Sequence, residues 1–243
     1  CLPSASPAFQ NTTTISDGTI AQVTYTWNFG DGTGDLTAPA VIPASPTHVF
    51  PGTGPYTVTL TAVSNNGCTH TVSKPYSAIF AQPVAAISPL TEVCVSGNVA
   101  FSSAASTAAG STVTGWTWNF GDGSPADITQ NPTHTYTTGG IKTVQLTVTS
   151  AAGCVSAIDT ALLTVNALPS ANFTDTINCS SRSVGFSDIS VANSGNITQW
   201  NWNFGGTEGT STQQNPTHVF AAEGNHTITL SVTTDKGCAS NPV

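Results

Sequence analysis

One run of alternating apolar and hydroxylated residues occurs three times along the chain. Its versions are Tyr56-Thr-Val-Thr-Leu-Thr-Ala62, Lys142-Thr-Val-Gln-Leu-Thr-Val148 and His226-Thr-Ile-Thr-Leu-Ser-Val232. Successive side chains of a strand point to opposite faces, so each run predicts a strand with one aliphatic and one hydroxylated face. Such strands are typical of an antiparallel sheet that packs on a core on one side and meets water on the other.

An aromatic run also occurs three times, and each copy ends in glycine. The copies are Tyr25-Thr-Trp-Asn-Phe-Gly-Asp-Gly32, Trp116-Thr-Trp-Asn-Phe-Gly-Asp-Gly123 and Trp200-Asn-Trp-Asn-Phe-Gly-Gly206, and a Pro-Thr-His segment follows each one. Alternating aromatic positions predict a strand, and glycine, which tolerates positive φ, predicts the tight turn that ends it. The core predicted from both runs consists of Trp27, Trp118, Trp202, Phe29, Phe120, Phe204, Leu60, Leu146 and Leu230.

Together these runs define a unit of about 85 residues, the size of a small sandwich domain, that is repeated three times. We predict an all-β chain of three tandem antiparallel β-sandwiches, at residues 1–82, 83–168 and 169–243. The linkers around Pro83 and Pro169 are short and partly apolar, which favours a stiff, rod-like chain. The first domain lacks the opening strand that the second and third domains have. The third domain ends before the closing strand that the first and second domains have. An excerpt from a longer array is therefore expected.

Two cysteines occur in each repeat, one before a short strand and one after the alternating run. Six cysteines allow 15 pairings, and the repeat favours one bridge inside each domain. The predicted pairs are Cys1 with Cys68, Cys94 with Cys154, and Cys179 with Cys238. Each bridge would close about 60 residues and stabilise its domain by roughly 4 kcal/mol on the chain-entropy model. Disulfides also indicate an oxidising compartment.

Charge and hydropathy exclude several classes of protein. Four Lys and Arg against 12 Asp and Glu give a net charge of −8, so the chain lacks the basic surface that nucleic-acid binding needs. No apolar run approaches the ~18 residues of a membrane-spanning helix, so we expect no membrane insertion. A hydrophobic fraction of 38% with only 7% charged residues argues against disorder.

The Trp-Asn-Phe-Gly-Asp-Gly turn, the Pro-Thr-His segment and the Thr-Val-x-Leu-Thr-Val strand together resemble the PKD domain, an Ig-like sandwich of surface proteins. The resemblance covers nearly the whole chain, and the repeats look like those of very large bacterial surface proteins, including gliding-associated adhesins and secreted hydrolases with PKD spacers. The family usually has Asp where Asn28, Asn119 and Asn203 stand, and Gly206 replaces the turn Asp of the third repeat. The resemblance implies spacing, adhesion or contact with carbohydrate or protein, and no catalytic residues.

Candidate chemistry is sparse. His48, His134 and His218 occupy equivalent positions in separate repeats, so they cannot converge on one site, and hydrogen bonds to loop backbone are expected of them. Asp31 with Asp35 and Asp122 with Asp127 are weak candidates for binding Ca²⁺, and turn formation is the favoured role; no other cofactor or metal is expected.

No motif of a known catalytic site is present, so we expect no enzyme activity. Thr160 and Thr176 follow Asp in segments that resemble an O-glycan acceptor of some bacterial surface proteins. Both remain candidate glycosylation sites, which an intact mass would test.

The favoured function is a non-catalytic extracellular stalk module at the cell surface that spaces or displays other domains. Its first partners would be neighbouring repeats of the same long chain. One alternative is an accessory module of a secreted hydrolase that binds polysaccharide or a surface protein, with Trp116 and Trp200 as a platform if they are not core residues. Another is a subunit of a self-assembling filament, in which neighbouring copies supply the terminal strands.

Overall fold

A computed structural model describes residues 1–243 except residues 16–18, 40–44 and 179–180. The described residues form β-sheets, antiparallel except for the parallel pairing of β10 with β5, and one short 3₁₀ helix, η1 (Thr19–Gln22), and they contain no α-helix. The all-β prediction is therefore confirmed. The chain divides into two compact units, the first made of residues 1–86, 105–117 and 146–159, the second of residues 87–104, 118–145 and 160–243. The middle repeat contributes to both units.

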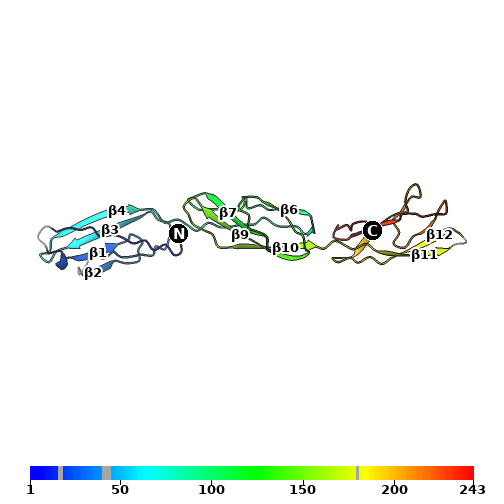
Figure 1. The fold of residues 1–243 in the computed structure, drawn as a ribbon. Coiled ribbons are helices and arrows are strands. Elements are labelled where there is room, and N and C mark those ends of the chain that lie inside the picture. The colour runs from blue at the N-terminus through cyan, green and yellow to red at the C-terminus, as the bar shows by residue number, and fades with distance from the viewer. Residues whose placement is uncertain (16–18, 40–44, 179–180) are drawn as a thin grey trace. The chain divides into compact units, whose positions relative to one another are not determined.

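The first repeat builds one four-stranded antiparallel sheet in the order β2-β1-β3-β4 (Figure 1). Its strands are β1 (Thr24–Asn28), β2 (Leu36–Pro39), β3 (Tyr56–Val63) and β4 (Thr69–Tyr76). The register places Trp27 of the aromatic run opposite Leu60 of the alternating run. Trp27, Phe29, Phe50, Val58 and Ile79 form the core, and Leu60 is partly buried against it.

The middle repeat has two sheets. One has the order β5-β10-β9-β7 and the other pairs β6 with β8. The strands are β5 (Val93–Cys94), β6 (Asn98–Ala100), β7 (Val113–Asn119), β8 (Thr133–Thr135), β9 (Gly140–Ser150) and β10 (Asp159–Asn166). Trp118 is fully buried, and its indole Nε1 donates a hydrogen bond to the Thr129 carbonyl at 3.1 Å. Leu146 and Phe120 are buried as well.

The third repeat has two three-stranded sheets, ordered β11-β12-β15 and β14-β13-β16. The strands are β11 (Phe173–Asn178), β12 (Ser183–Asp188), β13 (Ile197–Asn203), β14 (Thr210–Ser211), β15 (Thr217–Val219) and β16 (Thr229–Thr234). Trp202 lies opposite Leu230 in the register, and both side chains are fully buried in a cluster with Phe186, Phe204 and Phe220. The aromatic and alternating runs thus pair with each other in the same way in the first and third repeats.

The disulfides join different repeats, so the predicted pairing inside each domain is wrong. Cys1 is bonded to Cys154, and Cys94 is bonded to Cys238. Cys68 is an exposed free thiol, and Cys179 lies outside the described residues. In both bonds the first cysteine of one repeat meets the second cysteine of the next repeat.

The length of a strand explains why the two cysteines of the middle repeat do not meet. Cys94 pairs with Asn166 at the C-terminal end of β10, whereas Cys154 precedes the N-terminal end of that strand. A strand of this length rises by roughly 25 Å, and the Cα atoms of a disulfide lie about 4.4–6.8 Å apart. Each cysteine therefore has its partner beyond its own repeat.

Candidate functional site

Each repeat fastens its aromatic strand to the Pro-Thr-His segment through a histidine and a carboxylate. The distances are 2.6 Å from His48 Nε2 to Asp31 Oδ2, 2.7 Å from His134 Nε2 to Asp122 Oδ2, and 3.3 Å from His218 Nε2 to Glu208 Oε2. The sequence predicted backbone partners for these histidines, and the structure gives them carboxylate partners instead. We call each of these pairs, with the phenylalanine described next, a His clamp.

A phenylalanine ring stacks on the histidine of every His clamp. Ring centroids are 3.8 Å apart for Phe29 and His48, 4.1 Å for Phe120 and His134, and 4.2 Å for Phe204 and His218, with interplanar angles below 10°. In the third repeat the phenylalanine follows β13 of one sheet, and His218 lies on β15 of the other. The clamp therefore ties the two sheets of that sandwich together.

Glycine and asparagine shape the turn that carries the carboxylate. Gly121 has a φ of 74°, and a Cβ at this position would collide with the Thr143 carbonyl oxygen, so no larger residue fits. The Gly121 N–H donates to Asn119 Oδ1 at 2.9 Å, and equivalent bonds join Gly30 to Asn28 and Gly205 to Asn203. An amide oxygen thus accepts this bond at the positions where the PKD family usually has Asp.

Glu208 is a functional residue that sequence reasoning missed. The third repeat has Gly206 where the other repeats have the turn aspartate, which suggests that this turn lacks a carboxylate. The longer Glu208 side chain, two residues further on, reaches His218 and also accepts from the Ala221 N–H at 3.3 Å. The sequence does contain a signal for this role, because Glu208 is the first carboxylate after Gly206.

The carboxylates of the His clamps are held in their charged form. Burial works to raise the pKa of Asp122, but hydrogen bonds from Ser124 and His134 outweigh it and lower the pKa from 3.8 to about 2. The same balance of burial against hydrogen bonds from His48 and Thr33 lowers the pKa of Asp31. Burial and the charge of Asp122 raise the pKa of Tyr136 to about 12. These shifts are typical of structural ion pairs as well as of catalytic groups.

The Asp122 clamp predicts a dependence of stability on acid pH. Its folded pKa lies below the unfolded value, so its contribution is complete above about pH 4 and is lost as the pH falls through about pH 2. With allowance for solvent screening, we expect a loss on the order of 1 kcal/mol. Denaturant unfolding between about pH 5 and pH 2, with amide exchange in residues 118–145 as the readout, measures it. Asp122→Asn should remove this component, and an unchanged pH slope in that variant would contradict the assignment.

Polar contacts accompany each disulfide. Beside the Cys94–Cys238 bond, Lys236 Nζ lies 3.3 Å from Glu92 Oε1, and Asn166 Nδ2 donates to Glu92 Oε2 at 3.1 Å. In the first compact unit, which contains Cys1 and Cys154, Gln82 Nε2 donates to the Val155 carbonyl at 2.9 Å. The Lys236–Glu92 and Gln82–Val155 contacts also join residues of two successive repeats.

The second cysteine of every repeat sits in the same turn. The Cys154 carbonyl accepts from the Ser150 N–H at 2.9 Å, the Cys238 carbonyl accepts from Thr234 at 2.9 Å, and the Cys68 carbonyl accepts from Ser64 at 2.9 Å. Cys154 and Cys238 are buried in their bonds, whereas Cys68 is exposed. The turn that presents the thiol is therefore formed whether or not the sulfur is bonded.

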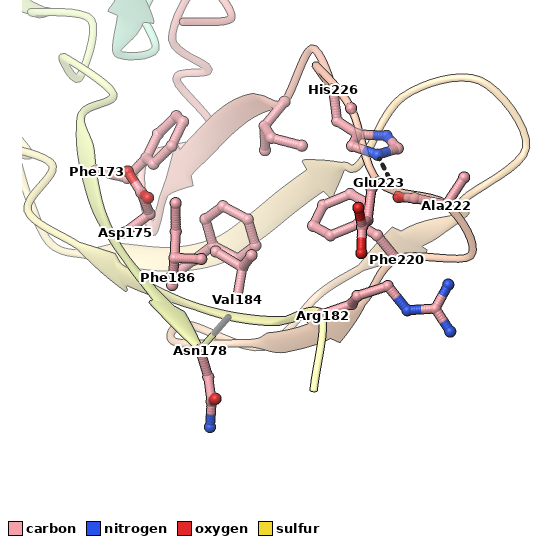
Figure 2. A pocket seen from close by; sticks show the side chains of 13 residues that line it. Phe173, Asp175, Asn178, Arg182, Val184, Phe186, Phe220, Ala222, Glu223 and His226 are labelled. Atoms are coloured by element: carbon pink, nitrogen blue, oxygen red, sulfur yellow. Dashed lines mark hydrogen bonds between the residues drawn. The ribbon is translucent and has the colours of Figure 1, made fainter. Parts of the chain in front are cut away.

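The third repeat contains a groove of about 530 Å³ that is lined by both apolar and polar side chains. Figure 2 shows the side chains of Phe173, Val184, Phe186 and Phe220, which line it, and those of Arg182, Glu223 and His226, which line it too. Ile177, Ala222 and Ile228 add apolar groups to the lining, and Asp175 and Asn178 add polar ones. Its walls come from β11, β12 and the segment between β15 and β16.

The calcium candidates are engaged in hydrogen bonds. Asp127 Oδ1 accepts from the Thr129 N–H and hydroxyl, and Asp35 Oδ1 accepts from Asn28 Nδ2 at 2.6 Å. Oδ1 of Asp31 and of Asp122 accepts from the following Thr33 or Ser124. Within the described ranges, no three His, Cys, Asp or Glu side chains are grouped so as to hold a metal. Weak calcium binding stays a prediction.

The remaining candidates belong to four different strands. Trp116 and Trp200 are both half-buried, and Trp200 Nε1 donates to Asp188 Oδ2 at 2.7 Å. Thr160 on β10 and Thr176 on β11 are exposed, as a modified residue must be. In the described part of the chain, no helix has the length and apolar character required to cross a membrane.

Comparison with known proteins agrees with the repeat. The PKD domain family matches residues 4–78, 80–165 and 166–243. The PKD1 domain of Vibrio anguillarum Epp is 26% identical over 35% of this chain and 98% of its own, with a TM-score of 0.30. Three N-terminal domains of the bacteriophage RB49 outer capsid protein Hoc are 13% identical over 97% of this chain and 96% of theirs, with a TM-score of 0.37.

Fibronectin(III)-like modules of Clostridium thermocellum CbhA are 11% identical over 63% of this chain and 83% of theirs, with a TM-score of 0.33. The three family matches cover almost all residues, and each contains one aromatic run, one Pro-Thr-His segment and one alternating strand. The chain belongs to the PKD domain family and carries three tandem PKD repeats.

Proposed function

We propose that this chain is a non-catalytic extracellular structural module, which holds successive PKD repeats in a stiff series and so spaces or displays other domains at a cell surface. The observation that carries the proposal is the pairing of Cys1 with Cys154 and of Cys94 with Cys238. A bond inside one domain stabilises only that domain, whereas a bond between repeats also restrains the movement of one repeat against the next. Such restraint is useful in a spacer.

The His clamps support the same function. In each of the three repeats, the histidine of the Pro-Thr-His segment and the carboxylate of the turn bind each other. These side chains therefore stabilise the repeat itself. Disulfides favour an oxidising, extracellular setting. The surface chemistry fits it too, because a chain with 7% charged residues offers few charged groups for binding partners. The boundaries of the three domains at Pro83 and Pro169 remain part of this proposal.

Small-angle scattering on the chain before and after reduction tests the spacer function. We expect the oxidised chain to give a narrow distribution of distances and the reduced chain a broader one, because reduction removes the covalent restraint between repeats. Cys1→Ser with Cys154→Ser should reproduce part of the broadening, and Cys68→Ser should not. Amide exchange must show that the repeats stay folded. A distribution that reduction leaves unchanged would contradict the proposal.

The alternative of a polysaccharide platform has less support. A stacking platform needs exposed aromatic faces, but Trp116 and Trp200 are half-buried, and Trp200 is among the residues packed against the core of its repeat. Its indole N–H is also engaged by Asp188. The stalk module therefore stands as the preferred function.

A further inference from the structure

The two places where a disulfide joins successive repeats differ in the side chains around them. We call the surroundings of the Cys1–Cys154 bond the first junction and those of the Cys94–Cys238 bond the second junction. Each junction lies inside one compact unit, the first junction in the first unit and the second junction in the second unit. The two junctions can therefore be compared contact by contact.

At the second junction, side chains of the third repeat hold the backbone of the linker. Asn193 Nδ2 donates to the Leu168 carbonyl at 2.8 Å and to Ser170 Oγ at 3.1 Å. The Ala167 N–H donates to Ser194 Oγ at 3.0 Å. Asn193 has a φ of 59°, a left-handed conformation that asparagine adopts more readily than most residues. Two side chains thus fix consecutive peptide groups of the linker.

A third side chain of this repeat reaches back to the second repeat. Lys236 Nζ lies 3.3 Å from Glu92 Oε1, and Asn166 Nδ2 donates to Glu92 Oε2 at 3.1 Å. The hydrogen bonds from Asn166 and Lys236 lower the pKa of Glu92, so this carboxylate is charged at neutral pH. The ion pair between Lys236 and Glu92 therefore joins the two repeats without involving the sulfur atoms.

The first junction has alanine where the second junction has these three side chains. Counted from the glycine of the same turn and from the second cysteine of the repeat, the equivalents of Asn193, Ser194 and Lys236 are Ala108, Ala109 and Ala152. The turn glycines correspond, because Gly110 and Gly195 have φ values of 70° and 68°. An alanine side chain has no hydrogen-bonding group, so these positions cannot supply the contacts of the second junction.

The polar contact at the first junction is open to solvent. Gln82 Nε2 donates to the Val155 carbonyl at 2.9 Å, and both residues are exposed. Water competes for the donor and for the acceptor of such a bond, so its net contribution is small. The Cys1–Cys154 bond is therefore the main restraint that the first junction has been shown to contain.

We propose that the first junction is a redox-controlled hinge, whereas the second junction stays closed in both redox states. This inference rests on the proposed spacer function and specifies how that function is regulated. A dithiol reductant supplies two electrons and two protons: the S–S bond breaks, Cys1 and Cys154 become thiols, and the reductant becomes a disulfide. The first repeat then moves against the second, while Asn193, Ser194 and Lys236 keep the third repeat in place.

Two cysteine variants separate the junctions in small-angle scattering. Cys1→Ser with Cys154→Ser should broaden the distribution of distances severalfold more than Cys94→Ser with Cys238→Ser, because only the second junction has side-chain contacts that replace its bond. Amide exchange on the unaltered chain gives an independent measurement. The Ala167 N–H should stay protected after reduction, since its partner Ser194 does not depend on the disulfide.

A triple variant copies the first junction into the second. Asn193→Ala with Ser194→Ala and Lys236→Ala should scatter like the unaltered chain when oxidised, because the Cys94–Cys238 bond remains. After reduction it should give a broader distribution than the reduced unaltered chain and lose the protection at Ala167. Lys74→Ala, which removes an exposed lysine from β4 of the first repeat, is the matched control and should change neither result.

The outcomes distinguish the hinge from the spacer function. Equal broadening by the two cysteine variants, or a reduced triple variant that scatters like the reduced unaltered chain, would overturn the hinge and leave the spacer function standing. Absence of any broadening on reduction would contradict both. Thermal melts must show the variants folded; if one is not, the unaltered chain decides, and loss of protection at Ala167 on reduction would overturn the proposal.

Discussion

Digestion of the unreduced chain should release one peptide pair that joins Cys94 to Cys238 and another that joins Cys1 to Cys154. Removing the first bond with Cys94→Ser and Cys238→Ser should destabilise the third repeat by about 2–5 kcal/mol, because an unfolded chain without the bond gains conformational entropy. A loss of this size lowers the Tm of a small domain by roughly 10 °C or more. Peptide mapping and calorimetry measure the two effects.

The chain contains a matched control for this experiment. Cys68→Ser changes a cysteine in the same type of turn, but Cys68 is exposed and unbonded, so the variant should melt as the unaltered chain does. A labelling reagent for thiols should also modify Cys68 without prior denaturation. A peptide that joins Cys94 to Cys154, or an equal loss of stability in Cys68→Ser, would refute the pairing between repeats.

Replacement of Trp202 by alanine should cost about 3–5 kcal/mol, enough to unfold most of a domain of this size. Trp202 is fully buried, lies 5.1–5.5 Å in ring centroids from Phe173 and Phe186, and donates from Nε1 to the Gln213 carbonyl at 2.9 Å. The variant therefore loses ring packing and the hydrogen bond to the Gln213 carbonyl. Denaturant unfolding with amide exchange in the third repeat measures the loss.

Trp200 on the same strand serves as the comparison. Trp200→Phe keeps a smaller aromatic ring at a half-buried position and removes the indole donor to Asp188, which retains its bond from the Ser190 N–H. We expect a cost of about 1–2 kcal/mol. Similar losses for Trp202→Ala and Trp200→Phe would show that the core is not centred on Trp202.

The strands and the cores followed from local sequence. Alternation along the run from Tyr56 to Ala62, and along its two copies, predicts a strand. The two-residue period of a strand comes from its own backbone geometry, so neighbouring residues suffice to recognise it. The buried positions of Trp27, Trp118 and Trp202 agree with the aromatic run. Leu60, placed in the core by the pattern, is only partly buried.

The pairing of the cysteines could not be predicted from local sequence, because the chain is a repeat. A shift by one whole repeat brings every cysteine into an equivalent sequence environment, so bonds within and between repeats satisfy the same pattern. The length of β10 separates the two choices, because Cys94 pairs with Asn166 at the C-terminal end of that strand and Cys154 precedes its N-terminal end. The contact of Glu208 with His218 was likewise not predictable from local sequence. The turn that carries Glu208 differs in sequence from the equivalent turns of the other two repeats.

The order of the bonds along the chain bears on how the protein matures. The bonded residues are separated by 153 and 144 positions, and Cys68 and Cys94 are both synthesised between Cys1 and its partner Cys154. An oxidant that joins a cysteine to the next one to emerge would couple Cys1 to Cys68 before Cys154 is synthesised. Correct maturation therefore requires either that Cys1 stays reduced until a second repeat has folded, or that an isomerase exchanges the early bond.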